Sequence, residues 1–175
     1  MKKKILICLL AVLALCTLTG CGKEKCKGDK CNNTKKPVVQ EFEKKTQIGD
    51  QEILLDTEAE FFEAKFKYAS TANYQKLDTY TMIDETKDGI LLYRVGLYYF
   101  EDMPIYEVMA DTSLEESDSI EVNNNKWIRY TGFEDDKRLD MFIINKNNST
   151  YTVNFSSDYD DIERFIGDFL STIEF

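Results

Sequence analysis

Residues 90–100 read ILLYRVGLYYF. This stretch decides the fold because, in a strand, the side chains on both faces would be apolar. Only Arg94 and Gly96 interrupt the pattern. A strand that is apolar on both faces is covered on both faces, so the run predicts a strand inside a sheet with material packed on each side. Residues 80–84 predict a weaker strand before it, and residues 105–109 predict a further strand or its continuation.

Three more strands are predicted in the second half of the chain, each preceded by a short polar run. The polar runs are NNN at 123–125, EDDK at 134–137 and KNNS at 146–149. The strands that follow them are predicted at 127–130, 139–145 and 151–155. Because such polar runs are typical of tight turns, this part predicts an antiparallel meander. Nearer the N-terminus, alternation with charged residues predicts a strand with one buried face, formed by Phe62, Ala64, Phe66 and Tyr68.

The C-terminal segment carries the clearest helical pattern. Its apolar residues recur every three or four positions, at Ile162, Phe165, Ile166, Phe169, Leu170 and Ile173. This spacing predicts a long amphipathic helix that packs on the sheet. Ser157 or Asp158 is expected to cap it, with Asp160 and Asp161 in the first turn, where negative charge complements the helix dipole. The expected fold class is α+β: an antiparallel sheet with this long helix on one face and a helix or loop covering the other.

The N-terminus has the pattern of an export signal. Three lysines follow Met1, and an apolar run at residues 5–18 ends in Leu18-Thr19-Gly20-Cys21. A basic start before a short apolar run is typical of a signal peptide, here residues 1–20. The run is shorter than the roughly 20 residues that span a membrane. Its last residues resemble the bacterial lipobox, which implies a lipid on Cys21. We therefore expect a lipoprotein anchored to the outer, extracytoplasmic face of the cell membrane.

Residues 21–47 are predicted to be the lipidated end and a flexible basic linker, because they are polar and show no apolar periodicity. Within this linker, Cys26 and Cys31 leave three alternatives open: a disulfide, two free thiols or a metal site. Residues 48–175 are predicted to form a single globular domain.

Composition excludes several classes of function. The chain has no histidine and the predicted domain has no cysteine, so Ser-His-Asp and Cys-His catalysis are excluded. Residues 22–45 carry a net charge of +4, whereas the chain from residue 46 onward carries 11 basic and 28 acidic residues, a net charge of −17. The basic segment favours an anionic membrane surface, and the acidic domain argues against nucleic-acid binding. We assign no catalytic, cofactor-binding or metal-binding residue.

Two acidic clusters and one aromatic run have alternative interpretations. Residues 158–161 and 134–136 carry carboxylates that could hold calcium, but helix capping explains the first cluster and an exposed turn explains the second. Paired carboxylates could also hydrolyse glycosides. Residues 98–100, Tyr-Tyr-Phe, could bind a sugar or a partner protein where exposed, or could fill the core.

The order of elements resembles PsbP-like proteins and the small bacterial lipoproteins that share their fold. The resemblance covers residues 60–175 and rests on Asn-Lys-Trp at 125–127, Tyr-Thr-Val-Asn-Phe at 151–155 and Ser-Thr-Ile-Glu-Phe at 171–175. It implies an antiparallel sheet with helices on both faces, but no general set of catalytic residues. Such proteins usually carry a longer helix before the Trp strand, whereas residues 113–117 here allow only one or two turns.

The function expected from these patterns is that of a noncatalytic binding or accessory module, tethered outside the membrane, with an unknown ligand. The partner would be an envelope protein or glycan. The alternatives are a calcium- or small-ligand-binding domain and a carboxylate-based envelope hydrolase.

Overall fold

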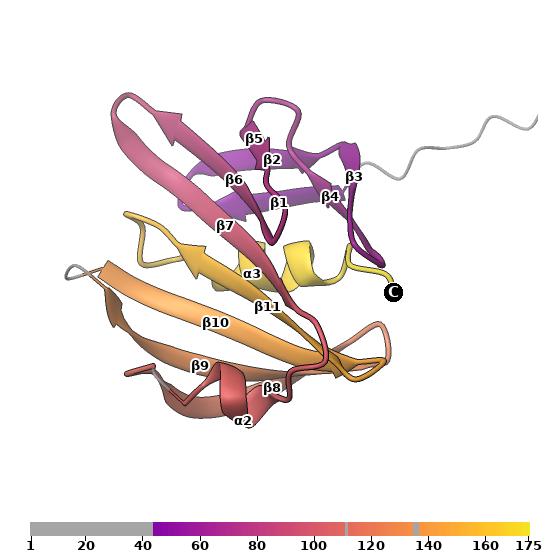
Figure 1. Cartoon of the computed structure of the whole chain (residues 1–175). Helices are drawn as coiled ribbons and strands as arrows, with labels where there is room; N and C mark the ends of the chain where they lie inside the picture. The colour runs from indigo at the N-terminus through magenta and orange to yellow at the C-terminus, as the bar shows by residue number, and fades with distance from the viewer. Residues whose placement is uncertain (1–43, 111, 135–136) are drawn as a thin grey trace, which may run out of the picture. The chain divides into compact units, whose positions relative to one another are not determined.

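The computed structural model describes residues 44–175 except residues 111 and 135–136. In this part the chain forms a seven-stranded antiparallel sheet and two separate two-stranded hairpins (Figure 1). In spatial order, the strands of the large sheet are β5 (Asn73–Lys76), β6 (Tyr80–Lys87), β7 (Ile90–Phe100), β11 (Ser149–Ser156), β10 (Lys137–Lys146), β9 (Asn125–Glu134) and β8 (Glu115–Val122). The predicted strand at 90–100 and the predicted meander, now β9–β10–β11, are confirmed.

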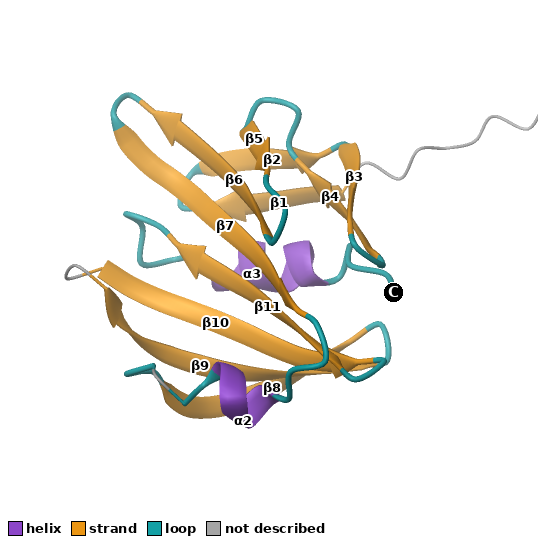
Figure 2. Cartoon of the chain, in the orientation of Figure 1, coloured by secondary structure: helices purple, strands orange, loops and turns teal. Residues whose placement is uncertain are grey.

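One face of the sheet is covered by the C-terminal helix and the two hairpins (Figure 2). Helix α3 (Glu163–Leu170) turns four fully buried apolar side chains toward the sheet: Phe165, Ile166, Phe169 and Leu170. The Phe165 ring lies 4.4 Å from the ring of Tyr93 in β7 and 6.3 Å from that of Phe155 in β11. Fully burying each such side chain contributes roughly 1.5–3 kcal/mol, so this layer contributes strongly to stability.

The hairpins complete the same layer. They consist of β1 (Lys44–Ile48) with β2 (Gln51–Leu55), and β3 (Thr57–Phe61) with β4 (Ala64–Tyr68). Their inward residues, Ile48, Ile53, Leu55, Phe61 and Phe66, are buried. Within β2 and β4 the buried residues recur at every second position, Ile53 with Leu55 and Ala64 with Phe66, as expected for strands with one dry face.

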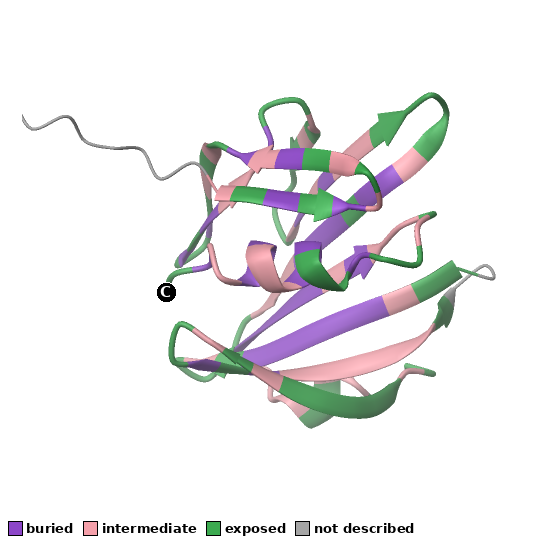
Figure 3. Ribbon diagram, turned by 180° about the vertical axis from the view of Figure 1, so that it is seen from behind, coloured by how far each residue is buried: buried purple, intermediate pink, exposed green. Residues whose placement is uncertain are grey.

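The opposite face of the sheet carries much less cover. Strand β7 pairs with β11, and the next strand in the chain, β8, lies at the far edge of the sheet. The connection between β7 and β8 therefore crosses several strands. It contains helix α2 (Ile105–Val108), which lies on the face of the sheet opposite α3 (Figures 1 and 3). Thr150 Oγ1 of β11 donates a hydrogen bond to the carbonyl of Met103 at 2.6 Å, which holds this connection against the sheet.

Tight turns set the register of the hairpins. Asn123 and Asn124, between β8 and β9, have φ angles of +52° and +60°. Asn147 and Asn148, between β10 and β11, have φ angles of +51° and +67°. Two successive residues with positive φ match the twist of an antiparallel pair, and asparagine tolerates this conformation better than most residues.

The C-terminal helix is shorter than predicted. It covers eight residues, begins after Ile162 and has no side-chain cap, so the prediction of a long helix capped by Ser157 or Asp158 is wrong. Ser157 instead donates its hydroxyl to the carbonyl of Leu92 at 2.6 Å, and Asp158 accepts the N–H of Leu91 at 2.9 Å. These two residues bind the end of β11 to β7, and their position before the helix leaves Asp160 and Asp161 outside its first turn.

Three other predictions are corrected. The segment at 105–109 contains helix α2, not a strand, because it follows Pro104, whose extended backbone starts the helical turn. Residues 113–117 lead into strand β8, not into a helical turn. Strand β1 begins at Lys44, inside the segment predicted as linker up to residue 47, so the domain begins earlier than residue 48.

Phe62 also departs from the prediction. It lies in the turn between β3 and β4 with a φ of +53° and is 48% exposed, so it does not belong to the buried face of the strand that follows. Its ring stacks on Tyr99 with 3.9 Å between the centroids.

Candidate functional site

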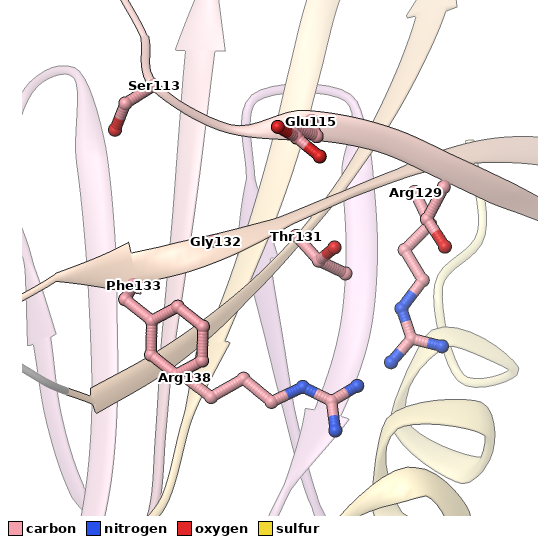
Figure 4. Close-up of a pocket in the computed structure, with 8 residues that line it drawn as sticks. Ser113, Glu115, Arg129, Thr131, Gly132, Phe133 and Arg138 are labelled. Carbon is pink, nitrogen blue, oxygen red and sulfur yellow. The ribbon is translucent and has the colours of Figure 1, made fainter.

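A pocket rich in arginine lies where the α3 face of the sheet is open. It has a volume of about 490 Å³ and is lined by Ser113, Glu115, Ser117, Arg129, Thr131, Gly132, Phe133 and Arg138. Arg129 and Arg138 extend toward each other beside α3, with Thr131 between them (Figure 4). We call this the arginine pocket. The chain contains four arginines in all, and two of them line it.

The strand register brings these side chains together. Thr131 of β9 is paired with Asp140 of β10, and Phe133 is paired with Arg138. Directly opposed residues of antiparallel strands point to the same face. Arg129, two residues before Thr131, is paired with the buried Phe142, so this row faces the core side of the sheet.

A buried carboxylate anchors both arginines. The Asp140 side chain is 3% exposed and accepts hydrogen bonds from Arg129 Nε at 2.9 Å and Nη2 at 2.7 Å. Arg138 Nε lies 3.0 Å from the second oxygen of the same carboxylate. The Arg129 guanidinium also lies 5.4 Å from the ring centroid of Phe142. A buried carboxylate is stable only with such charged hydrogen-bonding partners.

A second carboxylate, from Glu163, bridges the same arginines. Its Oε1 accepts from Arg129 Nη2 at 2.5 Å and from Arg138 Nη2 at 3.1 Å. The hydrogen bond from Arg129 lowers the pKa of Glu163, although burial opposes this. Burial lowers the pKa of Arg129, but its hydrogen bonds to Glu163 and Asp140 outweigh that effect and raise the pKa above its ordinary value. The Arg129 guanidinium therefore remains charged at neutral pH.

A second concave surface lies on the opposite face of the sheet. It is a shallow groove of about 760 Å³ between α2 and strands β9 and β10, lined by Asp102, Pro104, Ile105, Tyr106, Ile128, Tyr130, Asn145 and Asn148. We call it the tyrosine groove. The Tyr106 side chain is 73% exposed. Tyr130, which also lines the groove, donates its hydroxyl to Glu116 at 3.2 Å.

The acidic cluster at 158–161 is used structurally. Asp158 is paired with Lys137 at 2.7 Å and with the Leu91 N–H, and both bonds lower the pKa of its carboxyl. Within the described residues, no three or more His, Cys, Asp or Glu side chains are arranged to hold a metal ion. The cluster at 134–136 lies largely outside the described residues.

The aromatic run at 98–100 is divided between the two faces. Tyr99 points to the core side, where its ring lies 5.0 Å from Tyr151 and its hydroxyl is 3.1 Å from Ser149 Oγ. Tyr98 stacks on Tyr80 of the neighbouring strand at 5.6 Å on the other face. Neither belongs to the tyrosine groove, whose residues the sequence did not single out.

Cys21, Cys26 and Cys31 lie outside the described residues, as does the signal peptide predicted at 1–20. The arginine pocket is a site that the sequence analysis missed. A signal for it was present, because Arg129 and Arg138 flank the turn predicted at 134–137, and a tight hairpin there places nearby residues of two strands in register.

Comparison with known proteins assigns no family. No protein-family model and no curated protein matches the chain. A crystal structure of a protein from Bacteroides thetaiotaomicron covers 63% of this chain at 10% identity with a TM-score of 0.44, and only 44% of that protein's own length is matched. PA94 from Pseudomonas aeruginosa, a protein of unknown function, matches at 9% identity with a TM-score of 0.34. The match covers 61% of this chain and 85% of the PA94 chain. Among the described helices, α2 and α3 are both too short to cross a bilayer.

Proposed function

We propose that this chain is an extracytoplasmic lipoprotein, anchored through Cys21, whose domain is a noncatalytic binding module for a glycan of the cell envelope. The observation that carries the glycan proposal is the tyrosine groove on the sparsely covered face of the sheet. The domain is proposed to be PsbP-like, with α3 on one face and the segment around α2 on the other.

The side chains of the tyrosine groove suit a sugar chain. An aromatic ring packs against the C–H face of a sugar, and amide and carboxylate groups hydrogen-bond to its hydroxyls. Tyr106 and Tyr130 supply the rings, Asn145 and Asn148 the amides, and Asp102 a carboxylate. A shallow groove suits one segment of a longer sugar chain.

The exposure of Tyr106 supports this assignment. A large aromatic side chain that is 73% exposed gives up most of the stabilisation that burial would bring. Its hydroxyl is 3.1 Å from Glu107 Oε1, which orients the ring. An oriented, exposed tyrosine costs little additional side-chain entropy when a ligand covers it.

The noncatalytic character rests on composition. The chain has no histidine, and neither concave surface contains a cysteine or lysine nucleophile. The groove offers contact area and hydrogen bonds, which suit binding.

The glycan proposal is tested with the full chain in detergent and soluble peptidoglycan strands from which the peptides have been removed. Tyr106→Ala is expected to weaken binding about tenfold, the effect of removing an aromatic contact residue. Leu77→Ala, which removes another exposed apolar side chain away from the groove, is the matched control and should bind as the wild type does. Binding that is absent from the wild type, or unchanged in Tyr106→Ala, would overturn the proposal.

The anchor is tested separately by Cys21→Ser. The wild-type chain is expected to incorporate labelled palmitate and to sediment with membranes, because two acyl chains give stable anchoring. The variant should do neither. A variant that still carries label and sediments with membranes would rule out Cys21 as the anchor.

A further inference from the structure

We infer that the arginine pocket is a binding site for a carboxylate group, which takes the position that the side chain of Glu163 occupies in this structure. The site is independent of the tyrosine groove, because it lies on the opposite face of the sheet. Its geometry, its distribution of burial and its charge balance each point to this ligand chemistry.

The position of the Glu163 carboxylate is already built for an anion. One of its oxygens accepts hydrogen bonds from Nη2 of Arg129 at 2.5 Å and from Nη2 of Arg138 at 3.1 Å. Both guanidiniums are held from behind by the buried Asp140, so they keep their orientation without Glu163. A guanidinium held in place binds a carboxylate with little loss of side-chain entropy, which is the basis of strong arginine–carboxylate recognition.

Glu163 can leave this position, whereas Asp140 cannot. The side chain of Glu163 is 52% exposed and that of Asp140 is 3% exposed. Glu163 is the first residue of α3, so rotation of its side chain moves it into solvent and leaves the helix in place. Its charge remains near the positive end of the helix in either rotamer, which keeps the cost of the exchange small.

The charge balance selects a carboxylate over a phosphate. Asp140 and Glu163 form ion pairs with both guanidiniums, and Glu115 lines the same pocket. Exchange of Glu163 for a ligand carboxylate leaves the net charge of the site unchanged. A phosphate dianion would bring one more negative charge next to Asp140 and Glu115, and like charges at such distances repel.

The rest of the pocket can hold the body of a small ligand. Ser113, Ser117 and Thr131 line its wall, and Phe133, which is 74% exposed, lies at its edge. Its volume of about 490 Å³ lies within the range of small-molecule sites. The carboxylate can come from the end of a peptide or from an acidic side chain, and both present the same group.

Glu163 acts as a tethered competitor in this arrangement. A ligand binds only to the fraction of molecules in which Glu163 is displaced, so the apparent affinity is reduced by that fraction. Removal of the Glu163 carboxylate should therefore increase affinity. A pocket whose only role is to hold α3 against the sheet would show no such gain.

The test uses the full chain and the ¹H–¹⁵N signals of the arginine Nε–H groups, of which the chain has four. The probes are N-acetylglycine, for a chain end, and the α-amide of N-acetylglutamic acid, whose side-chain carboxylate is free, for an acidic side chain. N-acetylglycinamide is the uncharged control for N-acetylglycine, and inorganic phosphate tests whether the pocket prefers a dianion. The carboxylate probes should shift the signals of Arg129 and Arg138, and Glu163→Ala should tighten this binding about tenfold.

Two further variants make the outcome unambiguous. Arg138→Gln should abolish binding, whereas Arg164→Gln should leave it unchanged, because Arg164 lies on α3 outside the pocket. Should Glu163→Ala fail to fold, Glu163→Gln replaces it, since it removes the charge and keeps the side-chain volume. Equal shifts with N-acetylglycinamide, tighter binding of phosphate than of N-acetylglycine, or equal affinity in the wild type and the Glu163 variant would each overturn the inference.

Discussion

Arg129 of β9 holds Asp140 of β10 through two hydrogen bonds to one carboxylate oxygen, from Nε at 2.9 Å and from Nη2 at 2.7 Å. The Asp140 side chain is almost fully buried, whereas Glu163, which binds the same guanidinium, is half exposed. The two carboxylates therefore serve different purposes. Asp140 fixes the arginines in the sheet, and Glu163 links them to α3.

Asp140→Asn should destabilise the domain by about 3 kcal/mol, because it leaves two guanidiniums without their buried counter-charge. The free energy of unfolding in urea measures the effect. Glu52→Gln is the matched control: it breaks the Lys45–Glu52 ion pair, which has a similar distance of 3.0 Å but is exposed on both sides. The control should change stability by less than about 1 kcal/mol. Equal losses in the two variants would show that Asp140 behaves as a surface charge.

Glu163 should make the free energy of unfolding depend on pH under acidic conditions. Its pKa in the folded state is lowered from the ordinary 4.5, chiefly by the hydrogen bond from Arg129. Since the unfolded chain then takes up this proton first as the pH falls, the stabilisation is complete above pH 4.5 and is lost as the pH falls through the folded-state pKa. Urea unfolding over a pH series should show a shallower acid loss in Glu163→Gln than in the wild type. Parallel curves for the two proteins would contradict this.

Phe169→Ala should destabilise the domain by about 3–5 kcal/mol, because it opens a cavity in the layer between α3 and the sheet. Phe169 is fully buried and its ring lies 5.6 Å from that of Phe155 and 6.0 Å from that of Phe66. Arg164→Ala, on the exposed side of the same helix, should change stability by no more than about 0.5 kcal/mol. Thermal unfolding compares the two, and a small loss in Phe169→Ala would mean that α3 contributes little to the core.

Asn124→Val should cost about 1–2 kcal/mol, because Asn124 has a φ of +60° and a β-branched residue is strained there. Asn124→Gly should stay within about 0.5 kcal/mol of the wild type, since glycine adopts this conformation without strain. Urea unfolding of both variants measures the difference. Equal stability of the valine and glycine variants would show that the β8–β9 turn adjusts its backbone to the residue it carries.

The sequence predicts well those parts of the fold in which local signals agree. In β7, β9, β10 and β11, an apolar run is bounded by turn residues, so the strand positions follow, and the short turns of β9, β10 and β11 also give their antiparallel pairing. Strand β8 was missed because its residues EESDSIEV are mostly charged or small, and an edge strand with exposed faces needs no apolar pattern. The hairpin of β1 and β2 was partly assigned to the linker because β1 reads KKTQI, with only two buried residues.

The candidate sites were less accessible from sequence. The arginine pocket depends on the register between β9 and β10, and the tyrosine groove depends on where the β7–β8 connection crosses the sheet. Both are long-range properties, whereas residue patterns report local ones. The acidic residues at 158–161 predict a helix cap, but the Asp158 carboxylate instead accepts hydrogen bonds from the N–H of Leu91 in β7 and from Lys137 in β10.

The ion pair between Lys44 and Asp168, 3.1 Å long, joins the first described strand to α3. If the chain is anchored through Cys21, any mechanical load on the domain enters at β1. The contacts between β1 and α3 would resist that load first. Within residues 44–175 as described, β1 is paired with β2 alone, so its hydrogen bonds can break one pair at a time. The tyrosine groove lies on the opposite face and would keep its shape while the hairpin yields. The hairpin of β1 and β2 would thus be the first part of the domain to unfold under such a load.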